Sequence, residues 1–422
     1  MRGHIGSSQG NVENNMMELT DATIQELAAL MQSGAMTSKD LVEAFRQVIA
    51  SDDASFNAVA FLNPDADMIA DTMDRERAEG RVRGPLHGVP ILVKDNLNTG
   101  DSMMTSAGSL ALDGSIAPTD SHIVTRLRNA GAVLLGKTNL SEWANFRSTR
   151  SSSGWSSRGG QVRNAYALDR SPGGSSSGSA VAAARGYCAG AVGTETDGSI
   201  VYPSSMNAVV GIKPTIGLVS RSGIIPIASS QDTAGPMGRT VADAAYILSA
   251  IAGSDPVDPS TAEADARAEM DYTAFLDPDT LRDARIGVVR NYAGFHDRVD
   301  AVFEEALRAL RDAGAKLTDG LSLVPRVELR PHELIVLRTE FKVGLNSYLA
   351  SLGPDAPISS LADLIAFNET HADRVMPHFG QETLIKAEAT SGLRDKSYLD
   401  AVATCHRLTR EDGIDRIMHE HD

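Results

Sequence analysis

The sequence predicts an α/β fold in which helices pack against a layered core of buried strands. Two short apolar runs, residues 89–93 and 132–135, have the length of buried strands, and the first is rich in β-branched residues. A helical pattern precedes each run, and helices that alternate with strands indicate a layered α/β core. With 422 residues, of which 42% are hydrophobic, the chain is long enough to bury such a core.

The chain opens with two predicted helices. Apolar side chains recur at helical spacing in the first of them, at Ile24, Leu27, Leu30 and Met31. A second helix follows residues 37–38, because threonine and serine are favoured helix caps. Its apolar positions are Leu41, Phe45, Val48 and Ile49. Further along, residues 121–129 form the predicted helix that leads into the strand at 132–135.

A long polar segment then interrupts the alternation. Residues 147–179 are dense in Ser, Gly and Arg, and a polar loop of this length inside a compact domain usually carries function. An Ala-rich helix is predicted over residues 179–189, and residues 200–212 return to apolar and small side chains. The walls of a substrate pocket are expected in the loop at 147–170, at residues 106–108 and in helices between 330 and 400.

A second alternation begins with a predicted strand at 286–289 and an amphipathic helix at 302–313. The inward positions of that helix are Phe303, Ala306, Leu307 and Leu310. Residues 255–283 are acidic and contain several prolines, so we expect a surface excursion there. No composition shift is strong enough to predict two domains. We therefore expect one domain over residues 17–422, after a disordered extension at 1–16 with Met16 or Met17 as alternative starts.

Charge and cysteine content exclude several classes of protein. The net charge of −16 and the pI near 5.1 argue against nucleic acids and anionic membrane surfaces as partners, because both require clustered Lys and Arg. Cys188 and Cys405 are too few to form a disulfide framework. The N-terminus lacks the apolar segment of a secretory signal. We expect a cytoplasmic protein; its oligomeric state is open.

Two motifs match nucleotide and hydrolase patterns without the required context. Residues 131–138 fit the phosphate-binding P-loop, but the residues between the two glycines are themselves strand-like, so their amides would be buried. Residues 174–178 fit the G-x-S-x-G elbow of α/β-hydrolases, which needs a buried strand directly before it. The preceding residues are polar and contain Pro172, so Ser176 is a poor candidate for an elbow nucleophile and a better candidate for a helix cap.

A third motif, residues 193–200, places Ser199 after Gly198 in a predicted tight turn. A serine nucleophile needs a neighbouring base, and His87 is the only histidine near these motifs. A lysine can take this role when burial keeps its amine neutral. Lys94 directly follows the buried run at 89–93, although a lysine at the end of a strand commonly extends its ammonium into solvent.

Four segments in order resemble the amidase signature family. Residues 84–96 resemble its lysine motif, residues 172–179 its Gly/Ser-rich signature, residues 193–203 with 211–215 its nucleophile segment, and residues 229–236 continue the likeness. The resemblance covers the chain from about the first capped helix to its end. It implies an α/β/α fold around a large mixed β-sheet. Members of the family normally extend well beyond the position of Asp422, so we expect the family's C-terminal portion to be lacking.

The resemblance also implies the site. Ser199 becomes the nucleophile, Ser175 the bridging serine held on a cis peptide bond, and Lys94 the neutral base that acts through Ser175. The spacing of the two serines matches that of the family. The expected oxyanion donors are the backbone amides of Thr196, Asp197, Gly198 and Ser199, because successive amides in one turn form an anion-binding nest. We expect Ser153, Gly154 and Ser176 to contact the substrate, a structural or rim role for His87, and no cofactor or metal.

Within the family, the sequence favours a free-standing hydrolase. Val201 stands where the A subunit of the tRNA-dependent amidotransferase usually has arginine, and Asp197 stands in place of a glycine. Residues 153–161 and 340–346 are more like the peptide amidase branch. We therefore expect hydrolysis of a peptide C-terminal amide or a similar small amide through an acyl-enzyme on Ser199. The alternatives are an amidotransferase A-type subunit and an inactive, shortened member of the family.

Overall fold

A computed structural model describes residues 19–269 and 271–421, and it contains two compact units. The larger unit comprises Met1–Thr273 and Phe341–Ala389, and the smaller unit comprises Ala274–Glu340 and Thr390–Asp422. This division differs from the single domain that the sequence predicts, and the chain enters the smaller unit twice. The predicted extension at residues 1–16 lies outside the described residues. No described helix is both long and apolar enough to span a bilayer.

The larger unit contains the elements that position the predicted site. Its helices include α2 (Ile24–Gln32), α3 (Ser38–Asp52), α4 (Ala66–Ala78), α5 (His122–Asn129), α6 (Ser177–Ala184), α7 (Val201–Met206), α8 (Val241–Ile251), α9 (Ala264–Arg267), α12 (Leu361–Thr370), α13 (Ala372–Val375) and α14 (Glu382–Glu388). Its strands are β1 (Val59–Leu62), β2 (Pro90–Lys94), β3 (Val133–Thr138), β4 (Trp155–Ser156), β5 (Gly160–Gln161), β6 (Gly190–Glu195), β7 (Val210–Gly211) and β8 (Thr233–Gly238).

The central sheet is mixed, as the resemblance implies. Six strands pair in the order β1-β3-β2-β6-β8-β7, and β2 runs parallel to both β3 and β6. The pairs β1–β3, β6–β8 and β7–β8 are antiparallel. Every residue of β2, β3, β6 and β8 is buried, which is the pattern of strands covered on both faces. The strands predicted at 89–93 and 132–135 are thus confirmed as β2 and β3.

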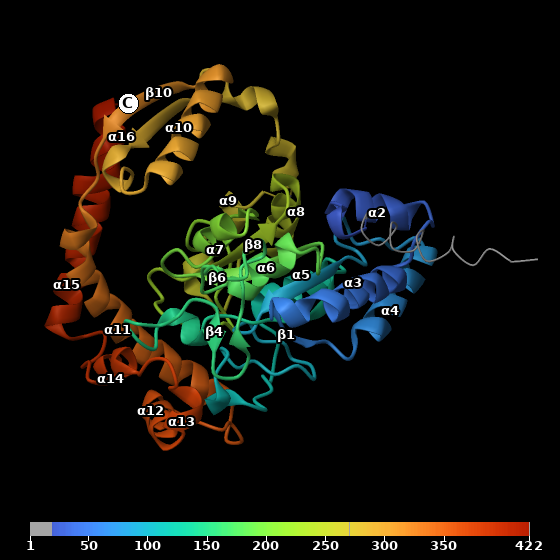
Figure 1. The fold of residues 1–422 in the computed structure, drawn as a ribbon, viewed down its shortest axis with the longest axis horizontal. Helices are drawn as coiled ribbons and strands as arrows, with labels where there is room; N and C mark the ends of the chain where they lie inside the picture. Colours follow the sequence, from blue (N-terminus) through green and yellow to red (C-terminus); the bar gives the residue numbers. More distant parts are fainter. Residues whose placement is uncertain (1–18, 270, 422) are drawn as a thin grey trace, which may run out of the picture. The chain divides into compact units, whose positions relative to one another are not determined.

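Helices cover both faces of this sheet, and two glycines of β6 show it directly. Side chains three residues apart on a strand point to opposite faces. A Cβ on Gly190 would lie 2.5 Å from Ile247 of α8, whereas a Cβ on Gly193 would lie 2.7 Å from Ser176 at the start of α6. Helices α6 and α8 therefore pack on opposite faces of β6, and α6 lies beside β6 in Figure 1.

The first helices form where the sequence predicts them. Thr23 and Thr37 cap α2 and α3, and each forms a capping box with an acidic residue three positions later, Glu26 and Asp40 respectively. The helix predicted at 179–189 is shorter than expected. α6 ends at Ala184, because Gly186 adopts a left-handed backbone with φ 67° and the chain then turns into β6. β6 itself was not predicted, since its small residues lack the composition of a typical strand.

The segment at 255–283 is only partly the surface excursion that we expected. Two of its first residues, Asp255 and Asp258, are buried, and they hold the neighbouring loop. Asp255 accepts a hydrogen bond from Ser220 (2.6 Å), and Asp258 forms an ion pair with Arg221 (2.5 Å). These contacts could not be read from composition, because acidic residues are usually exposed.

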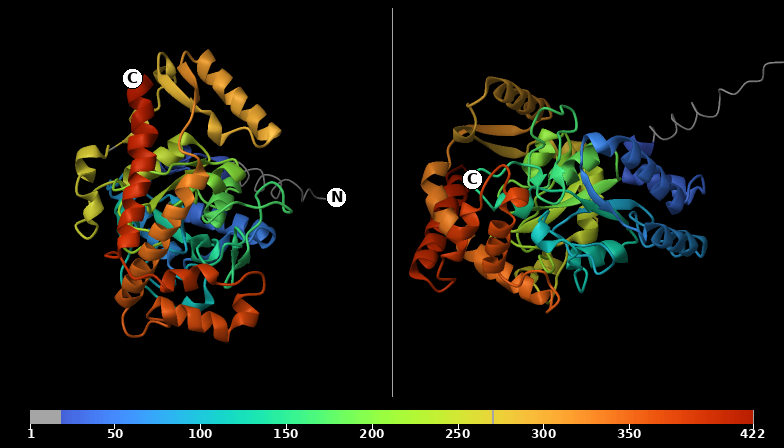
Figure 2. Two further views of the ribbon diagram at one scale, coloured as in Figure 1. Left: turned by 90° about the vertical axis from the view of Figure 1, so that its left-hand side faces the viewer. Right: turned by 60° about the horizontal axis from the view of Figure 1, so that its bottom comes forward.

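The smaller unit contains a β-α-β arrangement. Strands β9 (Arg285–Val289) and β10 (Lys316–Leu321) are parallel and are connected by α10 (Asp297–Asp312). α10 lies alongside the two strands in both views of Figure 2. The predicted strand and helix are confirmed, but of the inward positions only Leu307 is fully buried and Ala306 is exposed. Helices α15 (Lys396–His406) and α16 (Asp415–His421) complete the unit, and α11 (Arg326–Ser351) runs through its boundary.

A buried ion pair anchors the polar loop of the larger unit. Arg147 and Glu142 are fully buried and 2.5 Å apart. Arg147 also donates to the carbonyls of Val375 (2.7 Å) and Phe379 (3.1 Å), and its guanidinium lies over the Phe379 ring. The loop that follows residue 146 is therefore tied to the segment after α13.

We expect Arg147→Met to lower the free energy of unfolding by about 3–5 kcal/mol, because it leaves the Glu142 carboxylate buried without its partner. Urea denaturation measures the loss. Arg150→Met, an exposed arginine of the same loop, is the control and should change stability by less than about 0.5 kcal/mol. Equal stabilities of the two variants would show that the buried pair does not hold the loop.

Candidate active site

Lys94 is the last residue of β2, and its side chain points into the protein. It is fully buried, and its Nζ lies 2.7 Å from Ser175 Oγ, 2.8 Å from Thr194 Oγ1 and 3.3 Å from the Thr194 carbonyl. Thr194 lies in β6, the strand that pairs with β2. The structure thus brings Lys94 and Ser175 into direct contact, and the alternative of a solvent-exposed lysine at a strand end is wrong.

The surroundings of Lys94 favour a neutral amine. Burial lowers the pKa of the Lys94 ammonium to about 7, although the carboxylates of Asp232 and Glu195 oppose the shift. A neutral amine has two N–H donors and one lone pair. The two oxygens of Thr194 match the donors, and the lone pair is then available for the Ser175 hydroxyl proton. The geometry suits a general base that acts through Ser175.

Ser175 is held in place by its backbone. The Gly174–Ser175 peptide bond is cis, in agreement with what the resemblance implies. The Ser175 carbonyl accepts a hydrogen bond from the Ser141 amide (3.1 Å). A side chain at position 174 would not fit, because its Cβ would lie 2.4 Å from Ser141 Oγ. Glycine at 174 therefore allows this close approach of the two segments.

Ser199 lies in a tight turn between β6 and α7, and Glu195 organises this turn. The Glu195 carboxylate accepts hydrogen bonds from the amides of Gly198 (3.0 Å), Ile200 (2.7 Å) and Val201 (2.9 Å). Gly198 has φ 85°, in the left-handed region that favours glycine. Ser199 is nearly buried, with 8% of its surface exposed.

This turn changes the set of expected oxyanion donors. The Gly198 amide, one of the four that we predicted, is already bonded to Glu195 and points to the protein. For the amides of Thr196 and Ser199, no acceptor is found within the part of the chain that the structure describes. Sequence spacing alone cannot distinguish the bonded amide from the available ones, because each residue of the turn contributes one backbone amide.

Ser176 connects the two serine segments. Its amide donates to the Ser199 carbonyl (3.2 Å), and its hydroxyl donates to the Thr194 carbonyl (3.0 Å) and accepts from the Thr194 amide (3.2 Å). Ser176 is fully buried, as are Lys94 and Ser175, and its contact with a substrate stays a prediction. Among the described residues there is no direct hydrogen bond between the hydroxyls of Ser175 and Ser199.

The other two predicted substrate contacts lie on the polar loop. The Gly154 amide donates to Ser141 Oγ (2.8 Å), which brings this part of the loop beside the backbone of Ser175. Ser153 is half-buried and accepts a weak hydrogen bond from Asn145 (3.4 Å). The loop therefore contacts the site through Ser141.

Three other candidates from the sequence are the P-loop-like motif, the G-x-S-x-G match and His87. Lys137, at the end of the P-loop-like motif, lies in β3 and donates to the Leu97 carbonyl (2.7 Å) and to Thr105 (2.9 Å). It is fully buried, so this motif is a strand and does not form a phosphate-binding loop. The G-x-S-x-G match follows a loop, whereas a nucleophile elbow requires a buried strand directly before it. His87 is buried and bonded to the Met73 carbonyl (2.9 Å), as expected for a structural residue.

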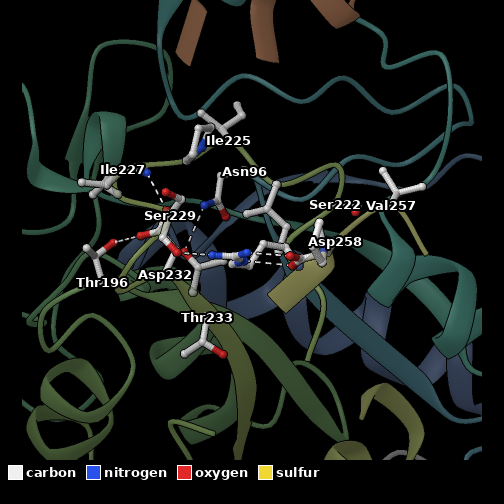
Figure 3. A pocket seen from close by; sticks show the side chains of 16 residues that line it. Asn96, Thr196, Ser222, Ile225, Ile227, Ser229, Asp232, Thr233, Val257 and Asp258 are labelled. Carbon is white, nitrogen blue, oxygen red and sulfur yellow. Dashed lines mark hydrogen bonds and ion pairs between the residues drawn. The ribbon is translucent and has the colours of Figure 1, made fainter. Parts of the chain in front are cut away.

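A cavity of about 310 Å³ adjoins the site and contains residues that sequence reasoning missed (Figure 3). Thr194 and Thr196 line it, so it meets both the partner of Lys94 and the nucleophile turn. Asp232 lies in its wall and accepts hydrogen bonds from the Thr196 hydroxyl and from the Ile227 amide (2.8 Å). Burial raises the pKa of the Asp232 carboxyl to about 6.

Asn96 lies in the same wall. Its Nδ2 donates to Thr194 Oγ1 (3.0 Å), the oxygen that also contacts Lys94. The sequence segments that contain Asp232 and Asn96 resemble the family, but nothing in the sequence distinguishes these two side chains from their neighbours.

Comparisons with known proteins identify a matching family model and similar sequences and structures. The family model described as Amidase matches residues 40–422. A protein of Arabidopsis thaliana named "Probable amidase" is 41% identical over 99% of this chain and 81% of its own length. The native peptide amidase of Stenotrophomonas maltophilia is 51% identical, with a TM-score of 0.90 over 95% of this chain and 82% of that chain. A peptide amidase structure with the competitive inhibitor chymostatin is 50% identical, with a TM-score of 0.91 over 95% of this chain and 82% of that chain.

Proposed function

The chain belongs to the amidase signature family of hydrolases, and we propose that it hydrolyses the carboxamide of peptide C-terminal amides or related small amides. The reaction proceeds through an acyl-enzyme on Ser199, with Ser175 and Lys94 as the relay. The observation that carries the proposal is the buried Lys94 amine, 2.7 Å from the Ser175 hydroxyl and with its pKa near 7. No other lysine–serine pair of this kind is seen in the described part of the chain.

In the first half of the reaction, Ser199 Oγ attacks the carboxamide carbon. The Ser199 proton passes to Ser175 Oγ, and the Ser175 proton passes to the lone pair of Lys94 Nζ. The C–N bond then breaks, and the same relay returns a proton to the leaving nitrogen, which departs as ammonia. In the second half, water attacks the ester carbonyl, loses its proton through the relay, and releases the carboxylic acid with Ser199 restored.

The turn that carries Ser199 supplies the electrostatic part of catalysis. The carbonyl oxygen becomes an oxyanion during attack, and we assign its donors to the amides of Thr196 and Ser199. The bond from Gly198 to Glu195 fixes the turn before the substrate arrives. Donors that are already oriented need no reorganisation during the reaction, and removing one such donor typically costs about 10²–10³ in kcat.

The preference for peptide amides rests on two lines of support. The chain is about half identical in sequence to peptide amidases over most of its length, and one of these is inhibited by the peptide-like chymostatin. Val201 is exposed and stands where the amidotransferase A subunit usually has arginine. An A-type subunit would need a partner that accepts ammonia, whereas the proposed enzyme releases it.

The experiment is an ammonia-release assay with amino-acid, peptide and aryl amides. We expect release from N-blocked peptide amides and capture of the acyl-enzyme by hydroxylamine as a hydroxamate. An inactive family member would release no ammonia from any amide, and a direct attack of water on the amide would give no hydroxamate.

We expect Thr194→Val to lower kcat/KM for a peptide amide by about 10–100-fold, because the hydroxyl that orients Lys94 is lost while the side-chain shape is kept. Thr196→Val provides the comparison within the same strand end, since Thr196 bonds to Asp232 and not to Lys94. Unchanged kinetics in Thr194→Val would show that Thr194 does not position the base.

A further inference from the structure

The cavity beside the site has an unusual wall. Five apolar side chains, Ile224, Ile225, Pro226, Ile227 and Val257, form much of its lining. The polar part of the lining includes two acceptors near the site, the Asn96 side-chain oxygen and the Asp232 carboxylate, and the Arg221 guanidinium, which is held by Asp258. Figure 3 shows Asn96 and Asp232 close together in this wall, with the apolar side chains around them. The cavity thus combines an aliphatic surface with a polar end next to the catalytic centre.

Two acceptors in this wall have capacity for a further donor. Asn96 is 3% exposed, and its Oδ1 has no hydrogen-bond partner among the described residues. A buried amide oxygen without a partner is costly, so a ligand that donates to it gains affinity. The Asp232 carboxylate accepts three hydrogen bonds, from Thr196, Ile227 and Ala228. A carboxylate has about four acceptor positions, so one remains.

The charges that line the cavity sum to a negative value. Arg221 is bound by Asp258 through two hydrogen bonds, from Nε (2.9 Å) and Nη2 (2.5 Å), so this pair is neutral overall. Among the described residues Asp232 forms no ion pair, although the nearby Arg221 charge lowers the pKa of its carboxyl, and Lys94 is neutral in the active state. At neutral pH the Asp232 carboxylate is ionised, because its pKa lies near 6. The net charge of −16 also favours the approach of cations.

We propose that this cavity binds a protonated amine or guanidinium carried by the substrate, so that the enzyme prefers amides with a positive charge close to the carboxamide. The inference rests on the proposed function and deepens it. The aliphatic wall accommodates the methylene chain, and the acceptors of Asp232 and Asn96 receive the N–H donors. The charge can come from a basic side chain of the terminal residue or from the free α-ammonium of an amino-acid amide.

The test measures binding and does not depend on turnover. Ser199→Ala protein is titrated calorimetrically with N-acetyl-lysinamide and with N-acetyl-norleucinamide, its neutral counterpart of similar shape. A second arm compares leucinamide with N-acetyl-leucinamide. We expect about tenfold lower Kd for the cationic member of at least one pair. A lower Kd for the cationic member of the first pair would show that the cavity binds a basic side chain. A lower Kd for the cationic member of the second pair would show that it binds the α-ammonium.

Three variants in the Ser199→Ala background identify the group responsible. Asp232→Asn should bring the ratio of Kd values close to one, whereas Asp169→Asn, an exposed aspartate outside the cavity, should preserve it. If Asp232→Asn does not fold, Val257→Lys decides, because Val257 is 78% exposed at the cavity wall and an added cation there should also lower the ratio.

Equal Kd values in both pairs, or a ratio unchanged by Asp232→Asn and Val257→Lys, would overturn the inference. Ammonia release by the unmodified protein is measured separately. Its absence would count against the proposed function, while the Kd ratios would still decide whether the cavity selects a cation.

Discussion

Replacing Ser199 with alanine is expected to lower kcat for a peptide amide by about 10⁴–10⁶-fold, the range typical of a lost serine nucleophile. The reason is that no other hydroxyl near the base lies in a turn with backbone amides ready for an oxyanion. Ser175 is nearer to Lys94, but its carbonyl and peptide are fixed against Ser141. Ammonia release under saturating substrate measures the effect.

Two observations accompany this result if Ser199 is the nucleophile. A fluorophosphonate should label the unmodified protein at residue 199 and leave Ser199→Ala unlabelled. Ser205→Ala, an exposed serine on α7, is the matched control and should keep full activity and labelling. Retention of activity in Ser199→Ala, or labelling at Ser175 in the unmodified protein, would assign the nucleophile elsewhere.

Lys94→Met is expected to lower kcat/KM by about 10²–10⁴-fold, the usual contribution of a positioned base. It should not weaken the fold. The amine has a pKa of about 7 when buried and 10.5 as a free side chain, so unfolding at pH 8 takes up a proton. Stability due to this group therefore rises with pH between these values, and removing the amine should stabilise the protein by up to about 3 kcal/mol at pH 8.

A second variant of Lys94 distinguishes a catalytic base from a lysine with a purely structural role. Lys94→Ala leaves space where the amine was, and a small primary amine added to the solution should restore part of its activity. Lys39→Ala, an exposed lysine on α3, should need no such rescue. A Lys94→Ala protein that is folded and inactive, and that no amine of suitable size restores, would argue for a purely structural role.

The sequence was sufficient to predict the strands that position Lys94, because β2 and β3 each begin with a short, continuous apolar run. It also placed Ser175 and Ser199 through their motifs. Their common location follows from the sheet order, in which β2 pairs with β6 and so brings Thr194 beside Lys94. That pairing joins segments far apart in the chain, and no local pattern contains it.

Other parts of the site depend on long-range register. Asp232 reaches the nucleophile turn because β8 runs antiparallel to β6, with Thr233 opposite Glu195. Glu195 binds the Gly198 amide through a turn whose geometry only the backbone reveals, and this removed one predicted oxyanion donor.

The pH dependence of kcat/KM tests the central claim, that a neutral Lys94 acts on Ser199 through Ser175. The free base is the active form, so kcat/KM for a neutral, N-blocked peptide amide should rise with pH through about 7 and reach a plateau above it. The rise should persist in Asp232→Asn but move to lower pH, because the Asp232 carboxylate otherwise raises the pKa of Lys94; its persistence excludes the Asp232 carboxyl as the source. A profile that is flat from about pH 5 to 8, or that rises only near the pKa of a solvent-exposed lysine, would contradict the account.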